Sequence, residues 1–473
     1  MTPHLSTPDL VLVGLYFVGL GWISRHLGGH GKTTRSYLLG DQNVPWWAVA
    51  LSILGSEISA LTFVGVPALA YTSNWAYLQL ALGAILARMI VARWFVPAYY
   101  EHKVTSIYEF LLTRFGPLTR NIAALLFLVS RVLMSGVRLY AGALIAQVAL
   151  GLTPGQGICL LAAIGFAYTV VGGIQAVIWT EVIQVIVMFA GALTALAILL
   201  SQGGVPHSSQ MQIIDLRLDP TLEFTLWTAL IGATFSGTAI FGTDYDMVQR
   251  MLTAEDSQRS GKAVVWSALA DLPIALLFLS IGSALAVFYQ AHPDPGLPAQ
   301  AKEIFPYFIM TRLPVGLAGL VVAAVLSVVL SSFESALNAL AGSFVVDIYR
   351  PYWGRGRDDA HCLRVTRWAM GGFTAALVVV ALYSQHITEI LKFGLEVGTY
   401  TYGALLAVFA VGLFTKGGSD RSCAFSVPVA VLVVLAVKTQ THLAFPWFVL
   451  IGTLTGASVA LAFVGVFGDV GQR

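Results

Sequence analysis

The segment LGSEISALTF, residues 54–63, places polar groups inside an apolar stretch that is long enough to cross a bilayer. It contains one carboxylate (Glu57), two serines, a glycine and a threonine. Ionisable side chains inside membrane spans are costly to desolvate, and they usually serve transport. Hydroxyl groups and unpaired backbone carbonyls are also the oxygen ligands that hard cations prefer. The segment therefore predicts a site for an ion or a polar solute within a membrane helix.

A second polar surface is predicted on the segment VVAAVLSVVLSSFESALNALAGSFVVDIY, residues 321–349. At 100° per residue, small and polar residues share one stripe of this helix, whereas the opposite side is Val, Leu, Ala and Phe. Close helix packing explains any single serine, but the complete stripe favours a weak sodium site. The stripe consists of Ser327, Ser331, Glu334, Ser335, Asn338 and Gly342, with Val328 and Ser332 at its edge.

The composition is typical of a polytopic membrane protein. Hydrophobic residues make up 57% of the 473 positions, and charged residues only 11%. The net charge of +2 is distributed over the loops and indicates no nucleic-acid partner. The three cysteines are far apart, which predicts neither a disulfide framework nor a zinc site. We find no nucleophile and base arrangement or phosphate loop, so the sequence predicts no enzymatic activity.

Thirteen apolar stretches have a length suited to membrane helices. They lie near residues 8–26, 45–71, 75–100, 119–149, 156–172, 174–201, 223–250, 262–290, 313–346, 365–385, 389–414, 422–440 and 444–467. We interpret the first as a retained helix rather than a signal peptide, because no basic region precedes it. The sequence therefore predicts an all-α membrane protein with about thirteen transmembrane helices.

The basic residues of the loops predict the orientation of the chain. With the N-terminus outside, the external loops hold only Arg217, Lys302, Arg312 and Lys438, and the larger clusters of Lys and Arg fall on the cytoplasmic side. Basic residues resist translocation, so this asymmetry predicts an external N-terminus and a cytoplasmic C-terminus. The membrane is expected to be the plasma membrane, here a bacterial inner membrane.

Two of the spans are interrupted by polar residues and glycines. The first is the segment around Glu57, and the second is GATFSGTAIFGTDYDMVQR, residues 232–250. These spans are five helices apart, which an inverted five-plus-five repeat would produce, with its site at the broken helices. Five regions follow: 1–43 (extra helix and loop), 44–201 (first repeat), 202–222 (external loop), 223–414 (second repeat) and 415–473 (two further helices).

Several motifs resemble those of the sodium:solute symporter family, and among its members the chain is most similar to bacterial sialic acid transporters. The similar stretches are VPWWAVALSILGSEISALTFVGVPALAYTSNW (44–75), GGIQAVIWTEVIQ (172–184), DMVQR (246–250), IGSALAVFYQ (281–290), SSFESALNALAGSFVVDIY (331–349) and, more weakly, GLFTKGGSDRS (412–422). This resemblance implies the LeuT-type inverted-repeat fold and sodium as the coupling ion.

The resemblance also implies a sodium site between the first and eighth core helices. Its carbonyl ligands would be Gly55, Ile58 and Val328, and its hydroxyl ligands Ser331 and Ser332. Some members bind a second sodium ion through an aspartate in a WTD motif. This chain has WTE, so Glu181 is a candidate second-sodium ligand whose alternative role is pairing with a neighbouring helix.

The implied solute site is less regular. Ser59 and Thr62 match hydroxyl positions of the sialic acid transporters, but Glu57 replaces a threonine, and shifted neighbours replace the usual glutamine and arginine. An unpaired Glu57 would favour an amino-bearing solute or a proton, whereas pairing with Arg131 or Arg138 would suit a sugar or polyol. The candidate solute-binding residues are Glu57, Ser59, Thr62, Tyr77, Gln79, Arg131, Arg138 and Phe241. Asp271, which lies beside Pro273, is expected to mark a helix kink.

These patterns predict sodium-coupled import of a small polar organic solute by alternating access. A sugar, a sialic-acid-like compound or a related organic acid or amino-bearing compound fits the residues. The alternatives are proton-coupled transport through Glu57 or Glu181, and a membrane sensor built on a transporter scaffold. The expected partners are the solute and the lipid bilayer, and the sequence leaves open whether the protein is a monomer.

Overall fold

The computed structural model describes residues 5–27, 33–58, 60–386, 390–464 and 466. Its α-helices are α1 (Thr7–Leu27), α2 (Thr34–Leu39), α3 (Trp46–Glu57), α4 (Ala60–Thr72), α5 (Leu80–Ile90), α6 (Val96–Glu101), α7 (Ile107–Arg114), α8 (Pro117–Leu150), α9 (Pro154–Ser201), α10 (Thr234–Thr243), α11 (Tyr245–Met251), α12 (Ser257–Ala291), α13 (Ala301–Arg312), α14 (Leu317–Ser343), α15 (Arg350–Tyr352), α16 (Asp359–Ser384), α17 (Ile390–Phe414), α18 (Asp420–Gln440) and α19 (Pro446–Ala462).

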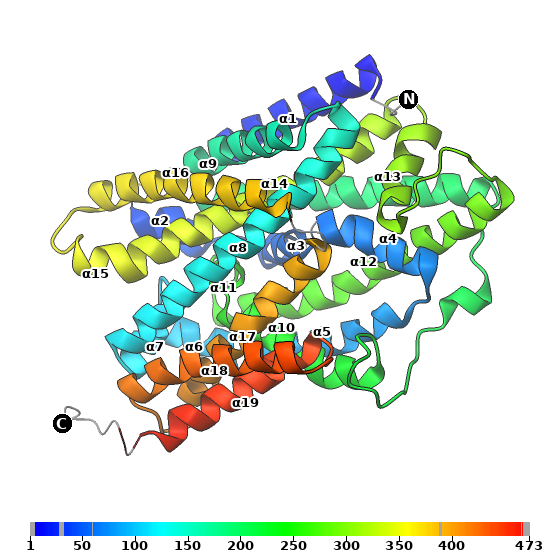
Figure 1. Ribbon diagram of the computed structural model, residues 1–473. Helices are drawn as coiled ribbons and strands as arrows, with labels where there is room; N and C mark the ends of the chain where they lie inside the picture. Colours follow the sequence, from blue (N-terminus) through cyan, green and yellow to red (C-terminus); the bar gives the residue numbers. More distant parts are fainter. Residues whose placement is uncertain (1–4, 28–32, 59, 387–389, 465, 467–473) are drawn as a thin grey trace.

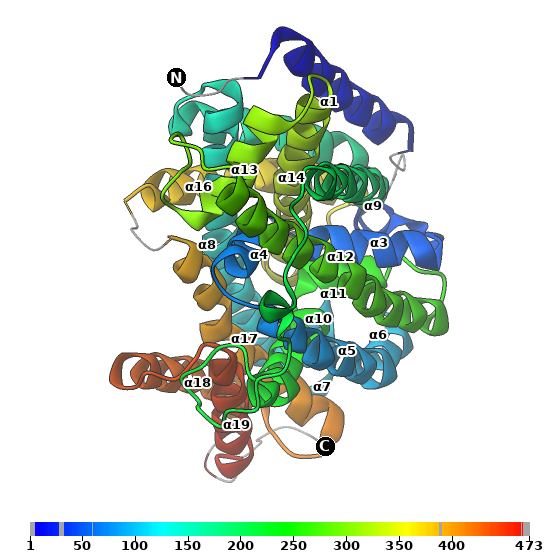
Figure 2. The same ribbon diagram turned by 90° about the vertical axis from the view of Figure 1, so that its right-hand side faces the viewer.

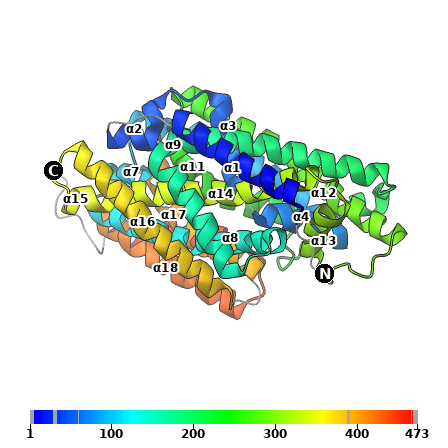
Figure 3. The ribbon, with the colours of Figure 1, turned by 90° about the horizontal axis from the view of Figure 1, so that it is seen from above.

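The helices form one bundle around α14, which is buried along nearly its whole length. Figures 1 and 2 show α1 and α9 on one flank and α18 and α19 on the opposite flank. Seen from above in Figure 3, α14 lies between these two groups. Helices α3, α8, α9 and α16 contact α14 directly, whereas α18 and α19 pack against α17. The polar stripe predicted from the sequence therefore lies at the centre of the protein.

Within the described residues, nine helices are long and apolar enough to cross a membrane, or ten if one bent pair is a single span. Two shorter apolar helices cover 154–170 and 446–462. The all-helical membrane fold is thus confirmed, whereas the count of thirteen spans stays a prediction. In α9 the backbone is interrupted at Gly173, with φ 60° and ψ −164°, where the sequence predicts one span to end and the next to begin. Glycine suits this position because positive φ is strained for other residues.

Both interrupted spans are broken in the structure. Helix α3 ends at Glu57, and the helix that follows is bent away from it by 64°. Helices α10 and α11 are separated by Asp244, whose backbone is extended (φ −87°, ψ 122°) and whose side chain caps α11. A broken helix leaves backbone carbonyls without intrahelical partners. These breaks therefore expose polar backbone groups inside the bundle.

The first helix is attached to the central helix through a carboxylate. Asp9 on α1 accepts hydrogen bonds from the backbone N–H groups of Gly316 (2.6 Å) and Gly319 (2.9 Å) at the start of α14. These N–H groups have no partner within α14, and the positive end of the helix dipole favours a carboxylate. The contact fixes α1 against the bundle at one end of α14.

Helices α4 and α12 approach each other closely at a glycine. A Cβ atom on Gly282 would lie 2.2 Å from the carbonyl oxygen of Pro67 and 2.8 Å from the Cβ atom of Ala70. Backbone atoms cannot move aside as a flexible side chain can, so this contact requires glycine.

We expect Gly282→Ala to force α4 and α12 apart and to lower the free energy of unfolding by about 1–3 kcal/mol. Thermal unfolding of the purified protein in detergent measures this loss. Gly372→Ala on α16 is the matched control, because a Cβ atom there meets nothing within 4 Å. Equal melting temperatures for the two variants would contradict the expected clash.

Candidate functional site

The predicted sodium ligands lie where the end of α3 meets the middle of α14. The Ser331 hydroxyl lies 3.4 Å from the carbonyl oxygen of Gly55. Ile58 follows the last turn of α3 in an extended conformation, so its carbonyl has left the helical ladder. The hydroxyl of Ser332 is buried and has no hydrogen-bond partner within the described residues. An unpaired buried hydroxyl beside freed carbonyls fits a sodium ion, which binds through oxygen atoms.

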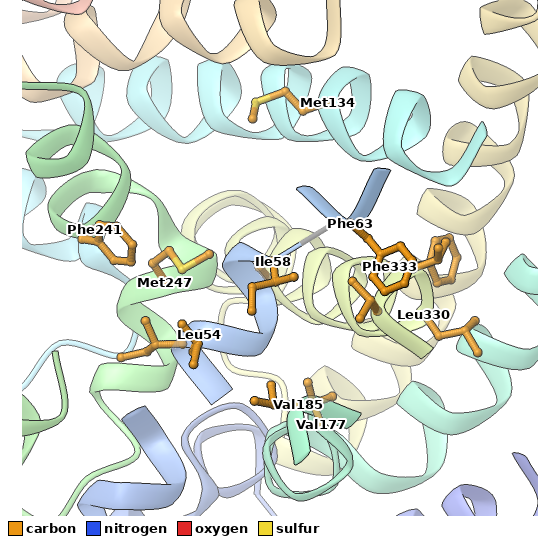
Figure 4. Packing of buried hydrophobic residues seen from close by; sticks show 14 of the residues in the cluster. Leu54, Ile58, Phe63, Met134, Val177, Val185, Phe241, Met247, Leu330 and Phe333 are labelled. Atoms are coloured by element: carbon orange, nitrogen blue, oxygen red, sulfur yellow. The ribbon is translucent and has the colours of Figure 1, made fainter. Parts of the chain in front are cut away.

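The packing around this point leaves no room for bulk water. Figure 4 shows the end of α3, marked by Ile58, between α9 with Val185 and α14 with Leu330. Val328 lies one turn before Ser332 on α14, and both are at least 96% buried. Few competing water molecules can enter such a site, so weak neutral oxygen ligands suffice for a cation.

Glu181 is the centre of a buried hydrogen-bond network beside this site. The Arg250 guanidinium donates to it through Nη2 (2.8 Å) and Nε (3.2 Å). Hydroxyl donors are Ser52, Ser56 (3.1 Å) and Ser331 (3.0 Å). A carboxylate offers about four lone-pair positions, so five donors occupy its acceptor capacity. The side chain is therefore fully engaged by protein groups from α3, α11 and α14.

A second network joins the break between α10 and α11 to three other helices. Arg131 on α8 pairs with Asp246 and with Asp244 (3.1 Å), and Arg250 pairs with Asp246 at 2.5 Å. The Tyr402 hydroxyl on α17 donates to Asp244 at 2.7 Å. The Ser335 hydroxyl on α14 donates to Asp246 at 3.3 Å. Each of these charges is buried and paired, as the low dielectric of the interior requires.

A cavity of about 950 Å³, including its open mouth, lies between the broken α3/α4 span, α5, α10 and α12. Its walls are largely apolar, with the polar groups of Glu57, Thr62, Tyr77, Ser236 and Asp271. Largely apolar walls with a few convergent polar groups are typical of a small-molecule site.

The partner of Glu57 differs from the sequence interpretation. Arg88 on α5, rather than Arg131 or Arg138, forms the ion pair with Glu57. The carboxylates Asp244 and Asp246 already engage Arg131, because the break between α10 and α11 brings them onto α8. Arg138 makes no ion pair or hydrogen bond that the described part of the chain reveals, and it does not line the cavity.

The remaining candidate solute residues occupy different environments. Thr62, Tyr77 and Phe241 line the cavity together with Glu57. Gln79 is buried away from it and accepts a hydrogen bond from the backbone N–H of Asp215 (3.1 Å) in the external loop. Ser59 lies outside the described residues.

Sequence reasoning missed two charged residues of the cavity region. The Arg88 side chain is fully buried, with its guanidinium 4.1 Å from the centre of the Phe241 ring and 4.0 Å from Asp271. Asp271, expected only to mark a kink, lines the cavity. The available signal was a charged residue inside an apolar span, because such residues need a partner of opposite charge.

The comparisons with known proteins agree with this geometry. The model of the "Sodium:solute symporter family" matches residues 37–426. The chain is 28% identical to the sodium/sialic acid symporter of Proteus mirabilis, covering 94% of this chain and 90% of that protein. It is 32% identical to the sodium-dependent multivitamin transporter of Oryctolagus cuniculus, covering 85% of this chain and 64% of that one.

A solved structure has the same fold. The substrate-bound, outward-open state of a Na⁺-coupled sialic acid symporter superposes with a TM-score of 0.89 at 24% identity, covering 99% of this chain and all of that chain. The fold is therefore the LeuT type, and the proteins compared are transporters rather than enzymes. Because the family model matches residues 37–426, which is most of the chain, the chain belongs to the sodium:solute symporter family and imports a small solute across a membrane together with sodium.

Proposed function

We propose that sodium binds between the end of α3 and the middle of α14 and drives uptake of a polar organic solute held in the adjacent cavity. The observation that carries this proposal is the unpaired, buried hydroxyl of Ser332 on the helix that faces the freed end of α3. The proposed ligands are the carbonyls of Gly55, Ile58 and Val328 and the hydroxyls of Ser331 and Ser332.

Sodium at this point would couple the two halves of the site. The same break that frees the carbonyls of Gly55 and Ile58 places Glu57 at the wall of the cavity. An ion that fixes the end of α3 against α14 therefore also orders the solute site. Release of the ion would loosen both sites, which is alternating access through a shift between conformations.

The solute is proposed to contact the cavity residues Glu57, Thr62, Tyr77 and Phe241. These side chains come from the broken first core span, from the start of the next span and from α10. They combine one carboxylate, hydroxyl groups and an aromatic face, which suits a small organic molecule with both polar and apolar parts. The relatives are named for different solutes, so family membership does not identify the solute of this chain. We therefore infer the solute class from these cavity residues.

We also propose an orientation in the membrane and the bounds of the two repeats. We infer an external N-terminus and a cytoplasmic C-terminus in the plasma membrane from the loop charges, and five-helix repeats at 44–201 and 223–414 from the positions of the breaks. The proposed ion ligands and the cavity belong to one chain.

We expect Ser332→Ala to raise the sodium concentration for half-maximal effect by about 5- to 150-fold, taking about 1–3 kcal/mol for the loss of one buried oxygen ligand. Sodium-dependent thermal stabilisation and sodium-driven uptake in proteoliposomes measure this change. Ser327→Ala, on the same helix, is the matched control, since its hydroxyl donates to the carbonyl of Ala323 (2.8 Å). Uptake that persists when potassium replaces sodium would contradict the proposed function.

We expect one sodium ion to bind per chain, because five hydrogen bonds already occupy the Glu181 carboxylate. Equilibrium binding of radioactive sodium to the purified protein should approach one mole per mole and require higher sodium concentrations in Ser332→Ala. Two ions per chain, with one of them lost in Glu181→Gln, would instead identify Glu181 as a second-sodium ligand.

A further inference from the structure

The cavity contains more negative charge than its neighbouring guanidinium can balance. Glu57 and Asp271 both line it, and Arg88 is the cation between them. Arg88 pairs closely with Glu57, whereas its distance to Asp271 is 4.0 Å and no hydrogen bond joins those two. Two carboxyl groups thus share one guanidinium, and a second cation beside Asp271 would complete the pairing of charges.

The two signs of charge are also separated in space. The side chains of Glu57 and Asp271 are 32% and 27% exposed, whereas the Arg88 side chain is 0% exposed. Arg88 lies behind the carboxylates and beside the Phe241 ring, and it is absent from the cavity lining. A solute in the cavity therefore meets the carboxylates directly and the guanidinium only through them.

No other cationic side chain of the described residues lines the cavity to balance Glu57 and Asp271. Its lining contains no arginine, lysine or histidine among the described residues. Arg138 acts on Glu57 electrostatically but forms no ion pair with it. The second buried cluster has three carboxylates, Glu181, Asp244 and Asp246, for the two guanidiniums of Arg131 and Arg250. Arg138 also interacts with that cluster, where one negative charge is in excess.

The rest of the lining suits an organic cation. Tyr77 and Phe445 contribute partly exposed aromatic surface to walls that are otherwise largely apolar. Aromatic faces attract ammonium groups, and carboxylates at the same point add a direct charge interaction. A carboxylate or sulfonate on a solute would be repelled in the same place.

We propose that this cavity selects solutes with a protonated amine or quaternary ammonium group, which lies near Glu57 and Asp271, and excludes solutes whose only charge is negative. The inference rests on the proposed function, because it takes the cavity as the solute site. It separates this chain from the relatives that are named for sialic acid.

A cysteine at the cavity wall can test the selection without knowledge of the natural solute. The probe position is Ala81→Cys, in a background where Cys159, Cys362 and Cys423 are replaced by alanine. Two methanethiosulfonate reagents of similar size are compared, one carrying a trimethylammonium group and the other a sulfonate. We take the ratio of the two rates of cysteine modification, cation over sulfonate, and divide it by the same ratio measured for a free thiol in solution. The intrinsic reactivities of the cysteine and of the reagents then cancel.

We expect the normalised ratio to favour the cation by at least about tenfold, and Asp271→Asn to reduce this preference several-fold. Asp271→Asn keeps the Arg88–Glu57 ion pair and the side-chain size, so the fold should persist. Glu57→Gln is the second variant, since Asp271 remains beside Arg88. Asp219→Asn in the exposed external loop is the matched control and should leave the ratio unchanged.

A normalised ratio near one, a preference for the sulfonate, or a preference that Asp271→Asn leaves unchanged would overturn the inference. Sodium-dependent thermal stabilisation of the same variants is measured in parallel. Loss of the sodium response with an intact charge preference would contradict the sodium site and leave the cavity selection standing. An intact sodium response without a charge preference would contradict the cavity selection and leave the sodium site standing.

Discussion

The arrangement of the core depends on one buried network of charges within the membrane bundle. Arg250 pairs with Glu181 and Asp246, and Asp246 pairs in turn with Arg131. Through these side chains and their hydroxyl partners, the network joins α3, α8, α9, α11, α14 and α17. An unpaired charge in this setting would cost several kcal/mol, so each helix must keep its register for the network to persist.

The two helix breaks follow from the same constraint. Asp244 leaves the helical conformation at the end of α10, caps α11 and reaches Arg131 and Tyr402. The last two turns of α3 carry Ser52 and Ser56, which donate hydrogen bonds to Glu181 before the chain turns away. Polar backbone in a membrane is tolerated only where protein groups or a ligand satisfy it. The network therefore supports both interruptions and, beside them, the proposed sodium and solute sites.

The residues proposed to bind sodium differ from those that face a solute in the cavity. The residues proposed to bind sodium, around Gly55, Ser331 and Ser332, lie where the end of α3 meets the middle of α14. Glu57 and Asp271 line the cavity and share Arg88, which lies behind them. A change in these few side chains alters the charge that a solute meets without disturbing the ion site. This separation is consistent with relatives whose named solutes differ.

The sequence by itself determined the membrane class, the two broken spans and the polar stripe on α14. These features depend on local hydrophobicity and on the spacing of residues along a helix. Only the tertiary structure decided that Arg88 pairs with Glu57, that Arg131 pairs with Asp244 and Asp246, and that Asp271 faces the cavity. An ion pair between helices depends on which faces meet across the bundle. The linear order of charges does not contain that information, because several arginines lie within reach of each carboxylate until the helices are packed.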